Sequence, residues 1–231
     1  MNNVIKRYIG PAFIILSLLL SASGCKKTSK PEPIAEPTET AAATDTDTET
    51  LELMANAIDA EILFTNGETI ELELYPDIAP KTVANFINYV NQGFYDGTII
   101  HRVVDGFVIQ GGGYDRELQR KEVSETVEGE FEENGIKNPL HHDRGVISMA
   151  RIPSEPNSAS TQFFIVVEDN REALDGQYAA FGRVRGGMDV VDAMAASKKM
   201  QDPPAGLSDM PDDIYEIESI TILDRNKGEN I

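Results

Sequence analysis

The chain of 231 residues has no tryptophan, one cysteine and three histidines. A single cysteine cannot form an intramolecular disulfide, so packing and hydrogen bonding alone must stabilise the fold, even in an oxidising compartment. The histidines are poorly spaced for a metal site, since His141 and His142 are adjacent and would point to opposite sides of an extended chain. Because a zinc site needs three or four ligands, we expect no bound metal, and nothing in the sequence implies another cofactor.

Basic residues are also scarce. The chain has 20 Lys and Arg against 39 Asp and Glu, which gives a net charge of -19, most of it after residue 57. A surface of this sign repels phosphate backbones, whereas sequence-independent nucleic-acid binding depends on Lys and Arg. The composition therefore excludes nucleic acid as a partner.

The signature motifs of hydrolases and phosphotransferases are missing. No serine lies in a G-x-S-x-G elbow, and the run from Gly111 to Gly113 lacks the Lys and the Ser or Thr of a phosphate-binding loop. The sequence therefore disfavours hydrolysis and phosphoryl transfer.

The most apolar run, "AFIILSLLL" at residues 12–20, is too short to span a bilayer as a mature helix. Lys6 and Arg7 precede it, so residues 1–25 have the pattern of an export signal. The signal ends in "SASGC", which resembles the lipobox of bacterial lipoproteins, although Ala22 stands where a larger aliphatic residue is usual. The resemblance implies that Cys25 is lipidated and anchors the domain to a membrane of the bacterial cell envelope, in the periplasm or otherwise outside the cytoplasmic membrane. The alternative is a plain secretory signal with an incidental cysteine.

The next segment, residues 26–57, is rich in Pro, Glu, Thr and Ala and poor in large apolar residues. Such a segment cannot bury enough surface to offset its chain entropy, so we expect a disordered acidic tether. The remaining residues, 58–225, are enough for one domain core, and a short tail follows at 226–231.

Apolar periodicity predicts the elements of this domain. In residues 57–76 apolar residues alternate with glutamates after an Asn66-Gly67 pair, which predicts a β-hairpin. Residues 80–93 begin with a proline and carry apolar residues at helical spacing, and residues 188–197 have a similar pattern. Further short apolar runs lie at 145–150, 162–167, 178–184 and 217–223. Many short strands with two helices predict a mainly β domain, either a barrel or a sandwich.

Four motifs follow one another along this domain: "HRVVDGFVIQGGG" (101–113), "GVISMAR" (145–151), "SASTQFFIVV" (158–167) and "ALDGQYAAFGRVRGGMDVV" (173–191). In order and approximate spacing they resemble the cyclophilin family of peptidyl-prolyl cis-trans isomerases. The resemblance implies a closed eight-stranded antiparallel β-barrel capped by two α-helices. It also implies a proline-binding groove on the outer face of the barrel.

The resemblance further implies roles for individual residues. Arg102 matches the catalytic arginine, Gln110 the amide that orients this arginine, and the backbone of Ala150 and Arg151 the segment that pairs with the substrate peptide. The residues that match the substrate-binding groove are Phe107, Val108, Gln110, Ala150, Arg151, Gln162, Phe164, Leu174 and Tyr178. Strand alternation then places Phe163 in the core. His101 is expected to be a hydrogen-bonding neighbour outside the groove.

These residue types suit a reaction that moves no proton. Rotation about an X-Pro bond faces a barrier of about 18–20 kcal/mol because the nitrogen lone pair is delocalised into the carbonyl group. A rigid, permanently charged guanidinium in a water-poor pocket can localise that lone pair. We therefore predict a monomeric isomerase that acts on proline-containing segments of exported or envelope proteins and assists their folding. A non-catalytic module that holds such segments as a chaperone or scaffold on the same tether is the alternative.

Overall fold

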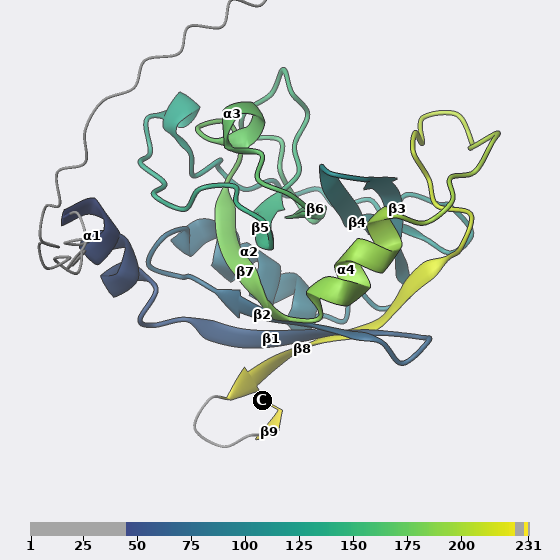
Figure 1. The fold of residues 1–231 in the computed structure, drawn as a ribbon, viewed down its shortest axis with the longest axis horizontal. Coiled ribbons are helices and arrows are strands. Elements are labelled where there is room, and N and C mark those ends of the chain that lie inside the picture. Colours follow the sequence, from purple (N-terminus) through teal and green to yellow (C-terminus); the bar gives the residue numbers. More distant parts are fainter. Residues whose placement is uncertain (1–44, 225–228, 231) are drawn as a thin grey trace, which may run out of the picture. The chain divides into compact units, whose positions relative to one another are not determined.

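The structure is a computed structural model that describes residues 45–224 and 229–230 (Figure 1). The predicted export signal, Cys25 and most of the predicted tether lie outside these residues. Within the described ranges, none of the helices combines the length and apolarity needed to cross a membrane.

The domain consists of nine strands and five short helices in the described part of the chain. The strands are β1 (Ile58–Phe64), β2 (Thr69–Leu74), β3 (Thr98–Val104), β4 (Val108–Asp115), β5 (Val146–Met149), β6 (Phe163–Val166), β7 (Ala180–Gly186), β8 (Tyr215–Asp224) and β9 (Glu229–Asn230). The helices are α1 (Asp45–Leu53), α2 (Pro80–Asn91), the 3-10 helix η1 (Glu132–Asn134), α3 (Arg171–Leu174) and α4 (Met188–Ala195).

Eight of the strands close into an antiparallel barrel in the order β1-β2-β7-β5-β6-β4-β3-β8. Strand β8 pairs back onto β1 to complete the ring, and the short β9 extends the sheet from β8. Closure pairs both long edges of the sheet, which removes them as sites of aggregation. The predicted eight-stranded antiparallel barrel is confirmed.

The first hairpin forms as the alternation predicts. Strands β1 and β2 are paired in register, and Ile70, Leu72 and Leu74 of β2 are all buried in the interior. Gly67 in the turn has a φ of 85°, a left-handed conformation that glycine adopts without steric cost.

The two predicted helices are α2 and α4. Helix α2 starts at Pro80, whose missing N–H is not needed in a first turn, and buries Val83, Phe86 and Val90. The carboxylate of Glu130, from a distant loop, accepts hydrogen bonds from the backbone N–H groups of Lys81 (3.0 Å) and Thr82 (2.8 Å). This negative charge therefore satisfies the free donors at the start of the helix and complements its dipole.

The expectation of disorder up to residue 57 is wrong for the last part of the tether, because helix α1 occupies Asp45–Leu53. Leu53 and Met54 pack against the core of the barrel, and Glu49 forms an ion pair with Lys137 in which Oε2 and Nζ are 3.1 Å apart. A short acidic helix gains its stability from such contacts with the folded domain, which composition does not reveal.

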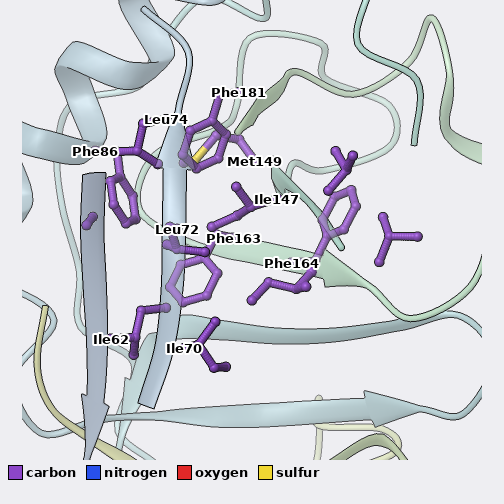
Figure 2. Packing of buried hydrophobic residues seen from close by; sticks show 14 of the residues in the cluster. Ile62, Ile70, Leu72, Leu74, Phe86, Ile147, Met149, Phe163, Phe164 and Phe181 are labelled. Carbon is purple, nitrogen blue, oxygen red and sulfur yellow. The ribbon is translucent and has the colours of Figure 1, made fainter. Parts of the chain in front are cut away.

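The interior of the barrel is filled with side chains. Those that pack together there include Ile62, Ile70, Leu72, Leu74, Phe86, Ile147, Met149, Phe163 and Phe181 (Figure 2). Because an eight-stranded barrel has little more interior than its own side chains fill, we expect a peptide to bind on the outside.

Candidate active site

A row of paired residues crosses four neighbouring strands on the outer face of the barrel. Arg102 on β3 is paired with Gln110 on β4, Gln110 with Phe164 on β6, and Phe164 with Ser148 on β5. Residues directly opposite one another in an antiparallel sheet point to the same face, so these four side chains lie side by side. The register of the barrel thus gathers residues from three separate motifs.

A pocket of about 90 Å³ lies over this row. It is lined by Arg102, Phe107, Val108, Gln110, Ala150, Arg151, Phe164, Leu174 and Tyr178. Every one of these residues belongs to the set that the family resemblance singled out. The last member of that set, Gln162, lines an adjoining pocket of about 120 Å³ together with Gln110, Ala150 and Arg151. The structure therefore brings all ten residues to one continuous area of the surface.

Aromatic rings form the apolar part of the pocket. Phe164 packs against the ring of Tyr178 edge to face, with centroids 5.4 Å apart, and stacks on His142 at 6.0 Å. Phe163, the next residue, is fully buried among the core side chains, and Figure 2 shows the two rings leaving β6 in different directions. The assignment of Phe163 to the core and Phe164 to the groove agrees with this geometry.

The guanidinium of Arg102 faces the pocket, with its Cζ 5.9 Å from the centroid of the Phe107 ring. Gln110 does not hold it there, which corrects the role expected from the resemblance. Its Nε2 instead donates a hydrogen bond to Oε1 of Gln162 at 2.9 Å. The charged partner of Arg102 is Asp209, whose Oδ2 lies 3.7 Å from the arginine Nε. Nothing in the motifs pointed to Asp209, because it lies in a late loop outside all of them.

The glycine run explains how the two glutamines meet. A Cβ atom on Gly113 would lie 2.5 Å from the side chain of Gln162, closer than real contacts allow. The missing side chain therefore leaves the space that Gln162 occupies beside Gln110. A Cβ atom on Gly111 or Gly112 would also lie within 3 Å of a neighbouring side chain, so all three glycines allow close approach of adjacent segments.

The side chain of Arg151 is buried and makes its contacts with other residues of the protein. Only 3% of the side chain is exposed, and its guanidinium lies between the rings of Phe131 and Tyr178, at 5.2 and 5.0 Å. It donates to the carbonyl oxygens of Gln177 (2.8 Å) and Pro153 (2.6 Å) and pairs with a glutamate. We conclude that the side chain of Arg151 holds Tyr178 in the pocket wall.

The adjacent histidines do not point to opposite sides, which corrects the expectation for an extended chain. His141 Nδ1 and His142 Nδ1 lie 2.6 and 2.8 Å from the two carboxylate oxygens of Asp175. His142 Nε2 also lies 3.1 Å from the hydroxyl of Ser148, behind Phe164. Since Asp175 follows Leu174, these bonds fix the loop that carries a wall of the pocket.

The pKa values of Asp175 and His142 are consistent with these hydrogen bonds. Burial alone would raise the pKa of Asp175, but hydrogen bonds from the His142 backbone and from both imidazoles hold it below its usual range. Burial lowers the pKa of His142 in spite of the opposing hydrogen bond to Asp175. No group of three or more His, Cys, Asp or Glu residues suited to a metal ion occurs within residues 45–224 and 229–230.

His101 is the neighbour of Arg102 in β3, but its side chain is buried. The centroid of its ring lies 4.8 Å from that of the Tyr114 ring. Its Nδ1 is buried and has no hydrogen-bond partner among the described residues, so the expected hydrogen bond is absent on that side. Burial lowers the pKa of His101 to about 4; a backbone hydrogen bond with Ile99 opposes this and the charge of Arg102 adds to it.

Comparisons with known proteins all match this chain to one protein family. The family model described as "Cyclophilin type peptidyl-prolyl cis-trans isomerase/CLD" matches residues 61–220. "Peptidyl-prolyl cis-trans isomerase B" of Escherichia coli (strain K12) is 41% identical over 166 residues, which cover 68% of this chain and 96% of that protein. "Peptidyl-prolyl cis-trans isomerase A" of Dickeya dadantii (strain 3937) is 46% identical over 138 residues, which cover 58% of this chain and 70% of that protein.

Among solved structures, a cyclophilin type peptidyl-prolyl cis-trans isomerase of Cryptosporidium parvum superposes with a TM-score of 0.59 at 26% identity, covering 73% of this chain and 99% of that one. Another crystal structure of the same Cryptosporidium protein was determined in the presence of the dipeptide Ala-Pro; it gives a TM-score of 0.58 at 26% identity and covers 72% of this chain and 99% of that one.

Proposed function

The chain belongs to the cyclophilin-type peptidyl-prolyl cis-trans isomerases and is an enzyme of that activity, and we propose that it isomerises X-Pro bonds in exported or envelope proteins and so assists their folding. In this proposal Arg102 is the catalytic residue and the pocket beside it receives the proline ring. The observation that carries the assignment is the position of the guanidinium over Phe107, at the edge of the pocket lined by Val108 and Phe164.

The chemistry requires only binding and one well-placed cation. Phe107, Val108, Phe164 and Leu174 remove water from around the proline ring, which strengthens electrostatic interactions at its nitrogen. The guanidinium of Arg102 donates to the prolyl nitrogen as that atom becomes pyramidal, so it stabilises the twisted imide more than the planar one. No base is needed, because no proton is transferred.

A site of this kind can supply the rate acceleration that the reaction requires. Spontaneous isomerisation takes tens to hundreds of seconds. Shortening this to milliseconds needs about a 10⁴-fold acceleration, which corresponds to about 5.4 kcal/mol at 1.36 kcal/mol per tenfold. Removing one preorganised donor from an active site costs about 10²- to 10³-fold, so Arg102 would supply a large share.

The test is a protease-coupled isomerisation assay on an Ala-Pro peptide. Arg102→Ala should lower kcat/KM by about 100-fold or more, and Arg102→Lys should recover only part of it because lysine lacks the rigid fork. Arg116→Ala is the matched control, since Arg116 is a largely exposed arginine paired with Glu216 away from the pocket. Absence of activity in the unaltered protein, with the fold intact, would support the non-catalytic binding module instead.

The proposed location depends on the N-terminal segment. Support comes from the apolar run at residues 12–20 and from the "SASGC" end with its single cysteine. Lipidation would attach the domain to a membrane of the cell envelope through the segment after Cys25. Cys25→Ser should move the protein from the membrane fraction to the soluble fraction after cell lysis. Unchanged membrane partition of this variant would count against the lipid anchor.

A further inference from the structure

The guanidinium of Arg102 has one charged partner within the described part of the chain, the carboxylate of Asp209. The distance from Asp209 Oδ2 to Arg102 Nε is 3.7 Å, which is too long for a hydrogen bond and makes the contact an ion pair. The two side chains are 30% and 37% exposed, so water and salt screen the pair only in part. Gln110 is engaged with Gln162 and does not replace this contact.

The backbone around Asp209 places its carboxylate beside the guanidinium of Arg102. Its carbonyl oxygen accepts a hydrogen bond of 2.9 Å from the N–H of Val103, the residue that follows Arg102. Its φ of 54° lies in the left-handed region, which Asp and Asn adopt more readily than most residues. The other carboxylate oxygen, Oδ1, lies 3.2 Å from Lys199 Nζ. Contacts on both sides therefore fix the carboxylate beside the arginine.

The loop around Asp209 is packed onto the strand that carries Arg102. Leu207 and Met210, on either side of Asp209, are buried against Ile99 of β3. The N–H of Met200 donates to the carbonyl of Met210 at 2.8 Å and ties the two arms of the loop together. This packing holds the loop that carries Asp209 against the strand that carries Arg102.

From this geometry we infer that Asp209 is a positioning residue for Arg102, an inference that rests on the proposed catalytic role of Arg102. Asp209 attracts the Nε edge of the guanidinium and leaves its terminal nitrogens for the substrate. Arginine carries large rotamer entropy, and the ion pair reduces that freedom before the peptide arrives. Lys199 offsets part of the negative charge of Asp209, so Arg102 keeps its attraction for the prolyl lone pair.

The test measures kcat and KM by NMR exchange on the neutral peptide N-acetyl-Ala-Ala-Pro-Ala-amide at about 0.05 M and about 1 M NaCl. Asp209→Asn removes the charge but suits the same left-handed backbone. It should lower kcat about threefold at low salt, with KM within about twofold. A threefold loss corresponds to about 0.6 kcal/mol, in the range of partly exposed ion pairs. High salt should lower kcat of the unaltered protein toward that of the variant, while kcat of the variant itself should change much less.

Two controls separate positioning from a structural role. Asp212→Asn removes a similar ion pair of the same loop, in which Asp212 Oδ2 and Lys198 Nζ are 3.2 Å apart, and should leave kcat and its salt response unchanged. In an Arg102→Ala background, Asp209→Asn should have no further effect, because the two residues act as one unit.

The inference is overturned if Asp209→Asn keeps the kcat and salt response of the unaltered protein, or if it causes the same loss without Arg102. An Arg102→Ala variant with full activity would overturn the catalytic assignment as well. A normal Asp209→Asn beside an inactive Arg102→Ala would overturn the positioning role alone.

Discussion

Acidification should destabilise the domain well before its carboxylates are protonated, because a histidine is buried in its neutral form. His101 is 4% exposed, its Nδ1 has no partner in the described ranges, and burial lowers its pKa to about 4. In the unfolded chain the pKa returns to about 6.5. Between these two pKa values the unfolded state binds a proton at His101 that the folded state does not bind. The contribution of neutral His101 to the free energy of unfolding is therefore complete above pH 6.5 and is lost as the pH falls toward 4.

The size of the effect follows from the two pKa values of His101. A pKa difference of one between the folded and unfolded states corresponds to about 1.36 kcal/mol, so the complete loss below pH 4 is roughly 3 kcal/mol, of which about 2 kcal/mol appears by pH 5. His142 adds to the loss in the same direction, since its pKa is also lowered by burial. Asp175 has a depressed pKa, so its contribution is lost only as the pH falls below about 3.8 and does not enter this window.

Urea unfolding at pH 8, 7, 6 and 5, in buffers of equal ionic strength, measures this loss of stability on acidification. With an m-value of about 2 kcal/mol/M, the midpoint should fall by about 1 M urea between pH 8 and pH 5 from His101 alone. His101→Phe keeps a buried ring but cannot titrate, and it should remove about that much of the drop. His142→Gln serves as the second variant and should remove only the smaller remainder. Equal midpoints at pH 8 and pH 5 in the unaltered protein, or an undiminished drop in His101→Phe, would show that His101 is not the source of acid sensitivity.

Four other substitutions, one of them a matched core control, test the pocket and the fold. Phe164→Leu should raise KM for an Ala-Pro peptide about fivefold to tenfold by shortening the pocket wall, whereas the matched core change Phe163→Leu should cost similar stability, about 1 kcal/mol, and leave KM unchanged. Arg151→Lys should lower the free energy of unfolding by about 1–2 kcal/mol and also raise KM, because lysine cannot stack and fork to hold Tyr178; wild-type values of both quantities would contradict this role. Glu130→Gln should lower the free energy of unfolding by about 1–2 kcal/mol, since both carboxylate oxygens accept backbone N–H groups at the start of α2 and the amide keeps only one acceptor oxygen and no charge, and a urea midpoint equal to that of the unaltered protein would argue against this cap.

The membership of the pocket could be predicted from the sequence because the motifs preserve which residue types occur together. Arg102, Phe107 and Gln110 lie within one short stretch, and a strand followed by a turn and a second strand places them close together. What each side chain does there was less predictable. Gln110 bonds a neighbouring glutamine, and Arg151 holds Tyr178 rather than extending toward a peptide. The choice among possible partners depends on distances of a few tenths of an ångström, which a motif does not encode.

The local elements of this protein follow from its amino-acid sequence without further information. Alternating apolar residues after Asn66-Gly67 were enough for the first hairpin, and helical spacing was enough for α2 and α4, because these patterns involve only residues close together in the chain. Folding of the whole chain is needed for the contacts that hold the site: Glu130 at the start of α2, Asp175 between two histidines, and Asp209 beside Arg102. Each joins segments that lie far apart in the sequence and meet only when the barrel closes, so no local pattern could specify them.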